Sequence, residues 1–282
     1  MAKIIAVVNQ KGGVGKTTTS VNLAASLAVL EKRTLVIDMD PQANATSGMG
    51  LGEQNVEGRE IYQVLHEQKT MAEVILPTAV DHLFCAPATA NLIGFEVEAV
   101  DLTDREHKLR HALATVRDDY DYILIDCPPS LSLLTINALC AADSVLVPLQ
   151  AEYYALEGLS RLMSTIEMVK QHLHPTLSLE GIVLTMFDTR NNLAHQVAQE
   201  VQTHFGAKVW NTKIPRNIRL SEAPSFGKPI ITYDIRSVGA QSYLALAEEF
   251  IVKTKPTGVN HEQRSTTGLG QGTIVPSTNP GN

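Results

Sequence analysis

One glycine-rich stretch near the N-terminus constrains this chain more than any other feature. Residues 11–18 read Lys-Gly-Gly-Val-Gly-Lys-Thr-Thr, after the apolar run 4–8 and before a segment with helical patterning. A buried strand that leads into such a turn lets the backbone N–H groups point inward, and a helix that starts near Lys16 directs the positive end of its dipole at the same place. The sequence therefore predicts a phosphate-binding loop with a nucleoside triphosphate as its ligand.

Two side chains of this stretch have distinct expected roles. Lys16 would reach the β- and γ-phosphates as a point charge, and the Thr17 hydroxyl would be a ligand of Mg²⁺. We therefore expect ATP and Mg²⁺ to bind here. The other residues expected to contact the nucleotide are Gly12, Gly13, Val14, Gly15 and Thr18.

The loop departs from the ordinary phosphate-loop pattern at one position. Where that pattern has its first glycine, this chain has Gln10, and a second lysine, Lys11, follows it. This spacing resembles the deviant Walker A motif of the ParA/MinD group of ATPases, and it is more specific than the common pattern.

Short β-branched runs alternate with helical patterns along most of the chain. The expected strands are residues 4–8, 34–37, 82–85, 122–125, 144–148 and 181–185. Apolar strands that alternate with helices form a parallel sheet covered on both faces. We expect an α/β fold with a doubly wound, mostly parallel sheet, of the phosphate-loop NTPase type, over residues 1–253.

Three aspartates follow predicted strands. Asp38 and Asp40 come after the second strand, and Asp126 comes after run 122–125. Ligands bind at the carboxyl ends of the strands in open parallel sheets, so these acids should converge on Lys16. Asp126 has the character of a Walker B acid that holds a water on Mg²⁺, and Asp38 is expected at the same metal site. Helix N-capping is the alternative role for each aspartate.

Composition limits the class of protein. The chain has 282 residues, a net charge of −7 and 44% hydrophobic residues, and it has no apolar run long enough for a membrane span. We expect a cytoplasmic protein. Its cysteines, Cys85, Cys127 and Cys140, lack metal-site spacings and read as reduced core residues, which argues against a redox ATPase that carries an iron–sulfur cluster.

Five blocks in order make the chain resemble the Soj/ParA chromosome-partition ATPases over nearly all of residues 1–253. The blocks are residues 11–18, 38–48, 126–131, 150–158 and 214–224. The resemblance implies an ATP-dependent homodimer that binds double-stranded DNA nonspecifically, associates with the nucleoid and hydrolyses ATP slowly. It also implies a ParB-type protein partner on a centromere-like site.

The same resemblance implies roles for single residues. Lys11 would reach across the dimer to the phosphates of the other subunit, and Asp40 would position the attacking water. A lysine at the exposed lip of the loop is well placed to neutralise charge from outside.

Other matched positions lie in the second half of the chain. The family loop that contacts adenine matches Pro215, Arg216 and Asn217, and the family DNA-binding surface matches Arg190 and Arg219. Arg216 could serve either surface. From bare sequence, exposed arginines are more often partners in surface ion pairs.

The remaining segments give weaker expectations. Residues 104–117 read as one helix with an acidic first turn, and residues 172–174 read as a solvated helix end. Residues 254–282 are rich in Thr, Gly, Ser, Pro, Asn and Gln and are expected to be a disordered tail. That composition does not fit the amphipathic membrane helix of MinD-type ATPases, so we expect no membrane partner.

An alternative function is a metabolic phosphate-loop enzyme, such as a small-molecule kinase or ligase on the same fold. It would need a substrate pocket with its own polar residues, and no such cluster stands out beyond the five blocks. Retention on DNA with and without ATP separates the two.

Overall fold

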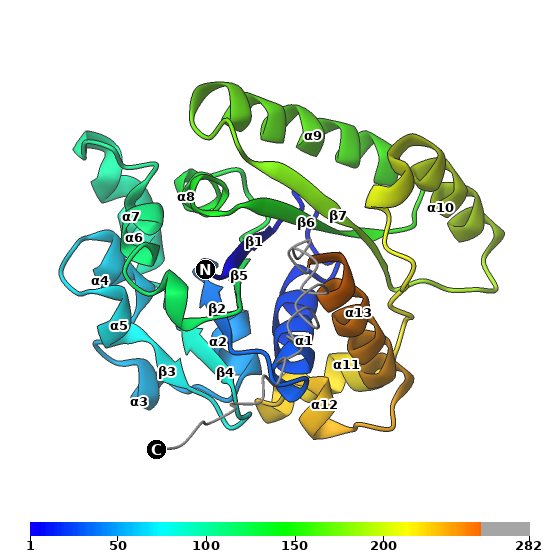
Figure 1. Ribbon diagram of the computed structural model, residues 1–282, viewed down its shortest axis with the longest axis horizontal. Helices are drawn as coiled ribbons and strands as arrows, with labels where there is room; N and C mark the ends of the chain where they lie inside the picture. The colour runs from blue at the N-terminus through cyan, green and yellow to red at the C-terminus, as the bar shows by residue number, and fades with distance from the viewer. Residues whose placement is uncertain (255–282) are drawn as a thin grey trace, which may run out of the picture.

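Alternating side chains of the first strand face two different cores. In β1 (Lys3–Val7), Ile4 and Ala6 contact one core, and Ile5 and Val7 contact the other. A strand that is apolar on both faces is stable only where helices cover both sides of its sheet. The computed structural model, which describes residues 1–254, has this arrangement (Figure 1).

The sheet has seven strands in the order β3-β4-β2-β5-β1-β6-β7. The strands after β1 are β2 (Thr34–Asp38), β3 (Leu76–Pro77), β4 (Leu83–Ala86), β5 (Tyr122–Asp126), β6 (Ser144–Gln150) and β7 (Ser178–Thr185). Every pairing is parallel except that of β3 with β4. The predicted doubly wound, mostly parallel fold is confirmed.

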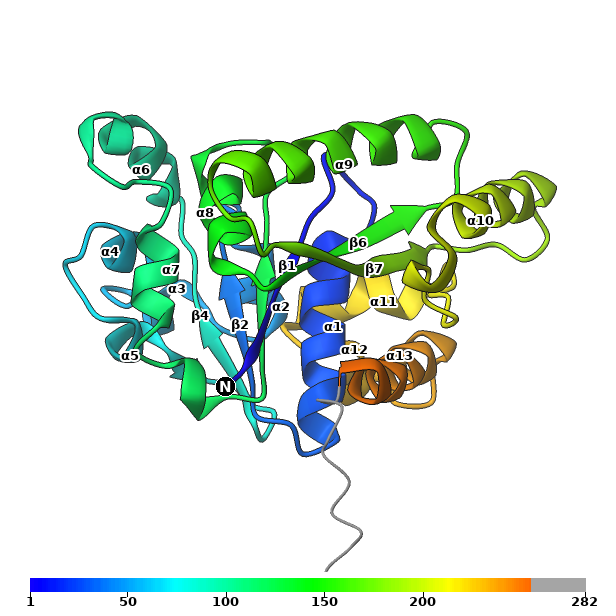
Figure 2. The ribbon, with the colours of Figure 1, turned by 45° about the horizontal axis from the view of Figure 1, so that its top comes forward.

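Helices form a layer on each face of the sheet (Figure 2). One layer packs on Ile5 and Val7 and contains α1 (Lys16–Val29), α2 (Asn44–Gly48), α11 (Ile218–Glu222), α12 (Ile230–Tyr233) and α13 (Val238–Thr254). The opposite layer contains α4 (Ile61–Leu65), α5 (Met71–Val74), α6 (Leu92–Glu98), α7 (Lys108–Leu113), α8 (Leu133–Ala141), α9 (Ala155–His172) and α10 (Asn192–Phe205). A short helix, α3 (Glu53–Val56), lies between α2 and α4 in the chain.

The strand register brings distant acids together. On the β1–β5 and β2–β5 ladders, Val7 and Asp38 are each paired with Asp126. All three positions end their strands, so the loop that follows β1 and the two aspartates meet at one edge of the sheet.

Two sequence predictions are wrong. The helix expected over 104–117 is only α7, because Asp104 has a positive φ of 55° and the chain turns before Lys108. His174 is not solvated: it is buried, and its Nδ1 lies 3.1 Å from the Leu139 carbonyl oxygen. The three cysteines are buried and free, as expected.

The predicted tail begins at residue 254, so all of it beyond that residue lies outside the described part of the chain. The division into a domain of residues 1–253 and a tail stays a prediction.

Candidate functional site

The loop between β1 and α1 forms a cradle with its glycines in unusual conformations. Gly13 and Gly15 have φ values of 73° and 84°, which only glycine adopts without strain. A Cβ built on Gly13 would meet no other atom within 4 Å, so space is open beside the backbone. Val14 is buried, and its carbonyl oxygen accepts a hydrogen bond of 2.8 Å from the Thr185 hydroxyl, which fixes the loop to β7.

The two lysines of this loop point in different directions. Lys16 is 7% exposed, and its Nζ donates to the Lys11 carbonyl oxygen at 3.3 Å, inside the loop. Burial lowers the pKa of Lys16, and the nearby Asp126 opposes that shift. The Lys11 side chain is about half exposed, and its ammonium group forms an ion pair with Glu152, away from the pocket.

Asp126 lies beneath the loop and fits a divalent cation. Its Oδ1 accepts a hydrogen bond of 2.7 Å from Ser20, whereas its Oδ2 is buried and has no hydrogen-bond partner in the described chain. Burial and the adjacent Asp38 raise the pKa of Asp126 to about 7. The nearby Thr17 hydroxyl partly opposes that rise in pKa. A buried carboxylate oxygen such as Oδ2, next to the Thr17 hydroxyl, is suited to Mg²⁺ and its bound waters.

Asp38 is engaged with its own loop. Its Oδ2 accepts bonds of 2.8 Å from both the backbone N–H and the hydroxyl of Thr46, and its Oδ1 accepts one of 3.1 Å from the Asp40 N–H. Burial raises the pKa of Asp38 to about 6. Asp38 therefore orders the loop that carries Asp40. This role is additional to its predicted place near the metal, and no sequence motif indicates it.

Asp40 borders the open space itself. It is 8% exposed, and its Oδ1 accepts the Gln42 N–H at 3.0 Å. Together with Lys16 and Thr17 it lines a pocket of about 610 Å³. This volume is in the range of small-molecule sites.

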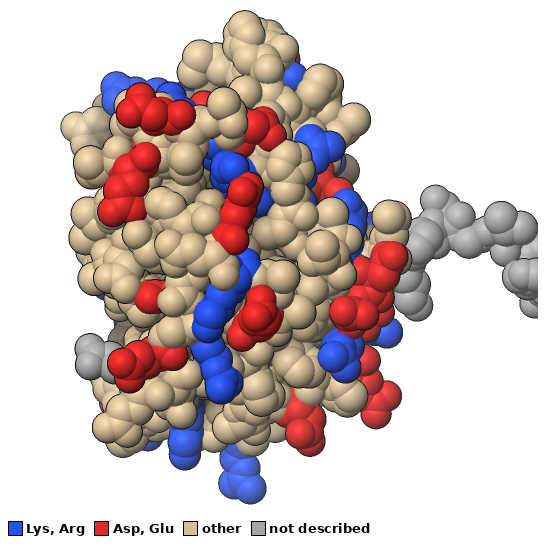
Figure 3. Space-filling model, turned by 90° about the vertical axis from the view of Figure 1, so that its left-hand side faces the viewer, with Lys and Arg blue, Asp and Glu red and all other residues tan. Residues whose placement is uncertain are grey.

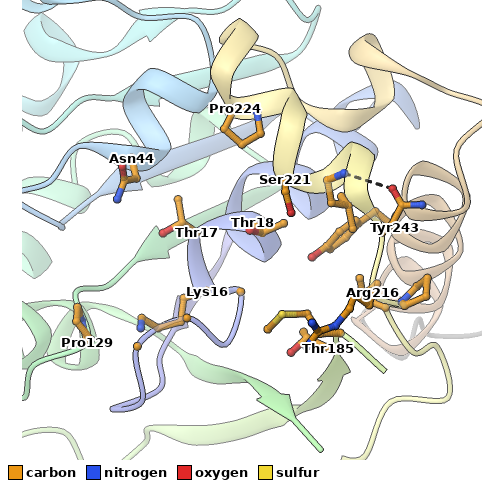
Figure 4. A pocket seen from close by; sticks show the side chains of 18 of the residues that line it. Lys16, Thr17, Thr18, Asn44, Pro129, Thr185, Arg216, Ser221, Pro224 and Tyr243 are labelled. Atoms are coloured by element: carbon orange, nitrogen blue, oxygen red, sulfur yellow. Dashed lines mark hydrogen bonds between the residues drawn. The ribbon is translucent and has the colours of Figure 1, made fainter. Parts of the chain in front are cut away.

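The far side of the pocket comes from the C-terminal elements (Figure 4). Pro215, Arg216 and Asn217 all line it, and their contact with adenine stays a prediction. Asn217 also caps α11, because its side-chain oxygen accepts the Leu220 N–H at 3.3 Å.

Sequence reasoning missed some of the pocket lining. Thr185, Met186 and Tyr243 line it and lie outside the five sequence blocks. Thr185 ends a predicted strand, so the strand-end rule could have found it. Tyr243 is buried within α13 with its hydroxyl 3.1 Å from the Thr19 hydroxyl, and no motif marks it.

The arginines expected to contact DNA are exposed and held by carboxylates. Arg190 donates two hydrogen bonds, of 3.0 and 2.9 Å, to Asp188. Arg219 donates to Glu222 at 2.8 Å and lies 3.6 Å from Asp234. Both arginines thus form the surface ion pairs that are common for exposed arginines.

Arg216 connects the nucleotide pocket with this arginine surface. It lines the main pocket and also a neighbouring hollow of about 330 Å³ that includes Arg190 and Glu152. The sequence left Arg216 between two surfaces, and the structure places it beside both.

The fold and this site define a class of protein, the phosphate-loop nucleotide-binding proteins with a second lysine in the loop. A family model described as an AAA domain matches residues 2–179. Among solved structures, a cobyrinic acid a,c-diamide synthase from Mycobacterium smegmatis with bound ATP analog and magnesium has a TM-score of 0.78 and 32% identity, covering 90% of this chain and 97% of that one.

Sequence relatives of known name show which family within this class the chain belongs to. A chromosome partitioning protein ParA of Myxococcus xanthus is 57% identical over 91% of this chain and 90% of its own length. The sporulation initiation inhibitor protein Soj of Bacillus subtilis is 57% identical over 88% of this chain and 98% of its own length. The chain belongs to the ParA/Soj family of chromosome-partitioning ATPases, as the five blocks predicted.

Among residues 1–254, no helix has the length and apolar character needed to cross a bilayer.

Proposed function

We propose that this partitioning ATPase is a dimerising switch. ATP joins two copies of the chain, and the dimer binds double-stranded DNA without sequence preference. Slow hydrolysis to ADP and phosphate separates the copies again. The output is the partitioning of a chromosome or plasmid together with a ParB-type partner.

The phosphate loop binds ATP in this account. The amides and side chains of residues 12–18, with Lys16 at their centre, hold the phosphates, and Pro215 and Asn217 hold the adenine. Mg²⁺ at Thr17 and Asp126, with Asp38 beside them, would supply positive charge to the β- and γ-phosphates. The unpartnered Asp126 Oδ2 supports this assignment.

Hydrolysis needs an oriented water and charge stabilisation. Asp40 borders the pocket with a carboxylate that is only 8% exposed, and we assign it the orientation of the attacking water. Lys11 supplies charge to the partner subunit's phosphates.

DNA binding is assigned to Arg190 and Arg219, with Arg216 next to them. Arg190 and Arg219 must each exchange a carboxylate for phosphate, so a single copy would bind DNA weakly. Two copies double the number of phosphates neutralised and act at a high effective concentration. We expect the ATP-bound protein to associate with the nucleoid for this reason.

The outward direction of Lys11 is the observation that carries the proposal. A lysine that served its own nucleotide would lie inside the cradle beside Lys16, whereas the Lys11 side chain is about half exposed and its ammonium group pairs with Glu152. This position is available to a second subunit.

The test is retention of the protein on an immobilised duplex of arbitrary sequence with ATP, with ADP and without nucleotide. The proposal predicts retention with ATP alone, equal on two unrelated duplexes and lost as salt rises. Equal retention in all three nucleotide states would contradict it.

A metabolic enzyme on the same fold is the alternative, and the similarity to the diamide synthase structure favours it. This alternative requires no DNA binding in any nucleotide state. The retention experiment therefore separates the two functions.

A further inference from the structure

An apolar stripe on α6 and the 3₁₀ helix Ala99–Asp101 lies on the outside of the molecule. Ile93, Val97 and Val100 are 59%, 73% and 62% exposed. Their spacing of four and then three residues places them on one helical face. The stripe is unusual because a surface helix normally has polar residues there.

The other face of the same segment is buried. Leu92, Phe95 and Ala99 are all 0% exposed and pack in the core. The segment is therefore anchored from within, and the outer stripe is not required to attach it. Contiguous exposed apolar side chains on an anchored helix are typical of an interaction surface.

Acidic residues flank the stripe. Residues 92–106 contain five acids and one arginine. Arg105 is already engaged, with Glu106 at 3.0 Å and with the Val100 carbonyl oxygen at 2.9 Å. Within residues 1–254, neither Glu96 nor Asp101 has an ion-pair partner.

Glu96 lacks a donor at one oxygen. Its Oε1 is buried and has no hydrogen-bond partner in the described chain. The negative charge of Glu96 beside the stripe is therefore not offset by a hydrogen-bond donor at this oxygen. Figure 3 shows this end of the molecule, where separate groups of Asp and Glu lie on a largely uncharged surface, with Lys and Arg side chains between them.

The carboxylates beside the stripe indicate which kind of partner can bind there. Unpaired carboxylates repel DNA phosphates and anionic lipid, and they attract a cationic segment. An apolar stripe with helical spacing fits the apolar face of a second helix. Both features are met by a basic amphipathic helix.

We propose that the stripe of Ile93, Val97 and Val100 docks a basic amphipathic helix of the protein partner. This inference rests on the proposed function, because it gives the partner in DNA partitioning a site on this chain. In both ribbon views α6 lies at the opposite end of the molecule from α10 and α11, which follow or carry the DNA-binding arginines (Figures 1 and 2). The chain can therefore bind partner and DNA at once.

The probe is a fluorescent helical peptide of about 15 residues, with leucines along one face and lysines on the other. Two control peptides are a scrambled version and one with glutamates in place of the lysines. Binding to the full-length protein is measured by anisotropy over a salt series.

The decisive variant is Ile93→Ser with Val97→Ser, because both side chains are exposed and their removal leaves the core intact. The matched control is Met168→Ser with Val252→Ser, whose side chains are 54% and 71% exposed on α9 and α13. We expect the Leu/Lys peptide to bind wild type and the control alike, and the stripe variant at least about tenfold more weakly. Glu96→Gln with Asp101→Asn should reduce the salt dependence of binding.

Three results would overturn the inference. In the first, the Leu/Lys peptide does not bind wild type. In the second, it binds the stripe variant and the control variant equally well. In the third, wild type and the control variant are dimers without nucleotide, and the stripe variant is a monomer. The last result would make the stripe a contact between copies of this chain.

DNA retention with ATP is measured on the same proteins. It should be unchanged in the stripe variant, because the arginines are remote. Wild type that is retained on DNA with ATP but binds no peptide refutes the inference alone, whereas absence of ATP-dependent retention in wild type refutes the proposed function.

Discussion

At the scale of single residues, Lys16 and Lys11 have different surroundings, so alanine substitutions at the two positions should impair different steps. Lys16→Ala removes the one lysine amine inside the loop and should weaken ATP binding by about 10- to 150-fold, as expected when a charge-assisted hydrogen bond is removed. Lys11→Ala should leave binding of ATP to the monomer within a few-fold of wild type and prevent the dimer. Titration calorimetry and light scattering measure both effects. Equal loss of nucleotide affinity in both variants would contradict the division of roles.

Asp40→Ala should separate binding from turnover. The phosphate cradle remains intact, so the variant should bind ATP, dimerise and stay on DNA, while hydrolysis in a single turnover falls by at least about a hundredfold. Wild-type turnover in this variant would mean that another group orients the water, and Asp38 would be the next candidate.

The buried acids predict an effect of pH on stability. The pKa values of Asp126 and Asp38, raised by burial to about 7 and about 6, lie above the value near 4 of an unfolded chain. The folded state therefore binds more protons between about pH 4 and 7, and these two groups make metal-free protein less stable as pH rises through that window.

The measurement is the melting temperature in EDTA from pH 5.5 to 8, for wild type and Asp126→Asn. The fall with pH should be smaller in the variant, which has one titrating acid fewer. Mg²⁺ with ADP should stabilise wild type more at pH 8 than at pH 5.5, because cation and proton compete for Asp126. Identical pH profiles for the two proteins would contradict the role given to Asp126.

At the scale of elements, the proposal assigns DNA binding to Arg190 on the β7–α10 turn and to Arg219 on α11. Arg219→Glu should abolish DNA retention while ATP binding and dimerisation persist. The double variant Arg219→Glu with Arg190→Glu should behave in the same way. A milder Arg219→Gln change should reduce the salt slope by about one unit for each phosphate that is no longer neutralised, so by about two in a dimer. Arg59→Glu, an exposed arginine between α3 and α4, is the control. Equal reductions of DNA retention in Arg219→Glu and the control would show a general charge effect.

The elements also show what the sequence could and could not predict. Strand ends were predictable because β-branched runs such as 122–125 are apolar on both faces, and a parallel sheet then brings Asp38 and Asp126 to one edge. The two-residue strand β3 was not, since a strand so short has no periodic pattern. The start of α7 was misjudged because the backbone reverses at Asp104, a conformation that composition does not encode.

Packing between residues far apart in the chain also limited what the sequence could predict about the site. Tyr243 enters the pocket only because α13 packs on α1, and Glu152 meets Lys11 only because β6 lies beside β1. Neither pairing follows from local pattern.

At the scale of the whole molecule, the proposed function requires an acidic chain with a net charge of −7 to bind a polyanion. Arg190, Arg216 and Arg219 lie on the turn before α10 and on or next to α11, and the acidic residues that flank the apolar stripe lie on and just after α6, at the opposite end of the molecule (Figures 1 and 2). A single copy offers few arginines, and both Arg190 and Arg219 are already paired with carboxylates. Under the proposed function, dimerisation is therefore the step that turns ATP binding into DNA binding.

The most direct test of this claim is the molar mass of the protein by light scattering with ATP, using Asp40→Ala to prevent turnover and a short duplex as ligand. The account predicts a dimer with ATP, a monomer with ADP, and duplex bound only to the dimer. A protein that stays monomeric with ATP, or a monomer that binds the duplex as tightly as the dimer does, would contradict it.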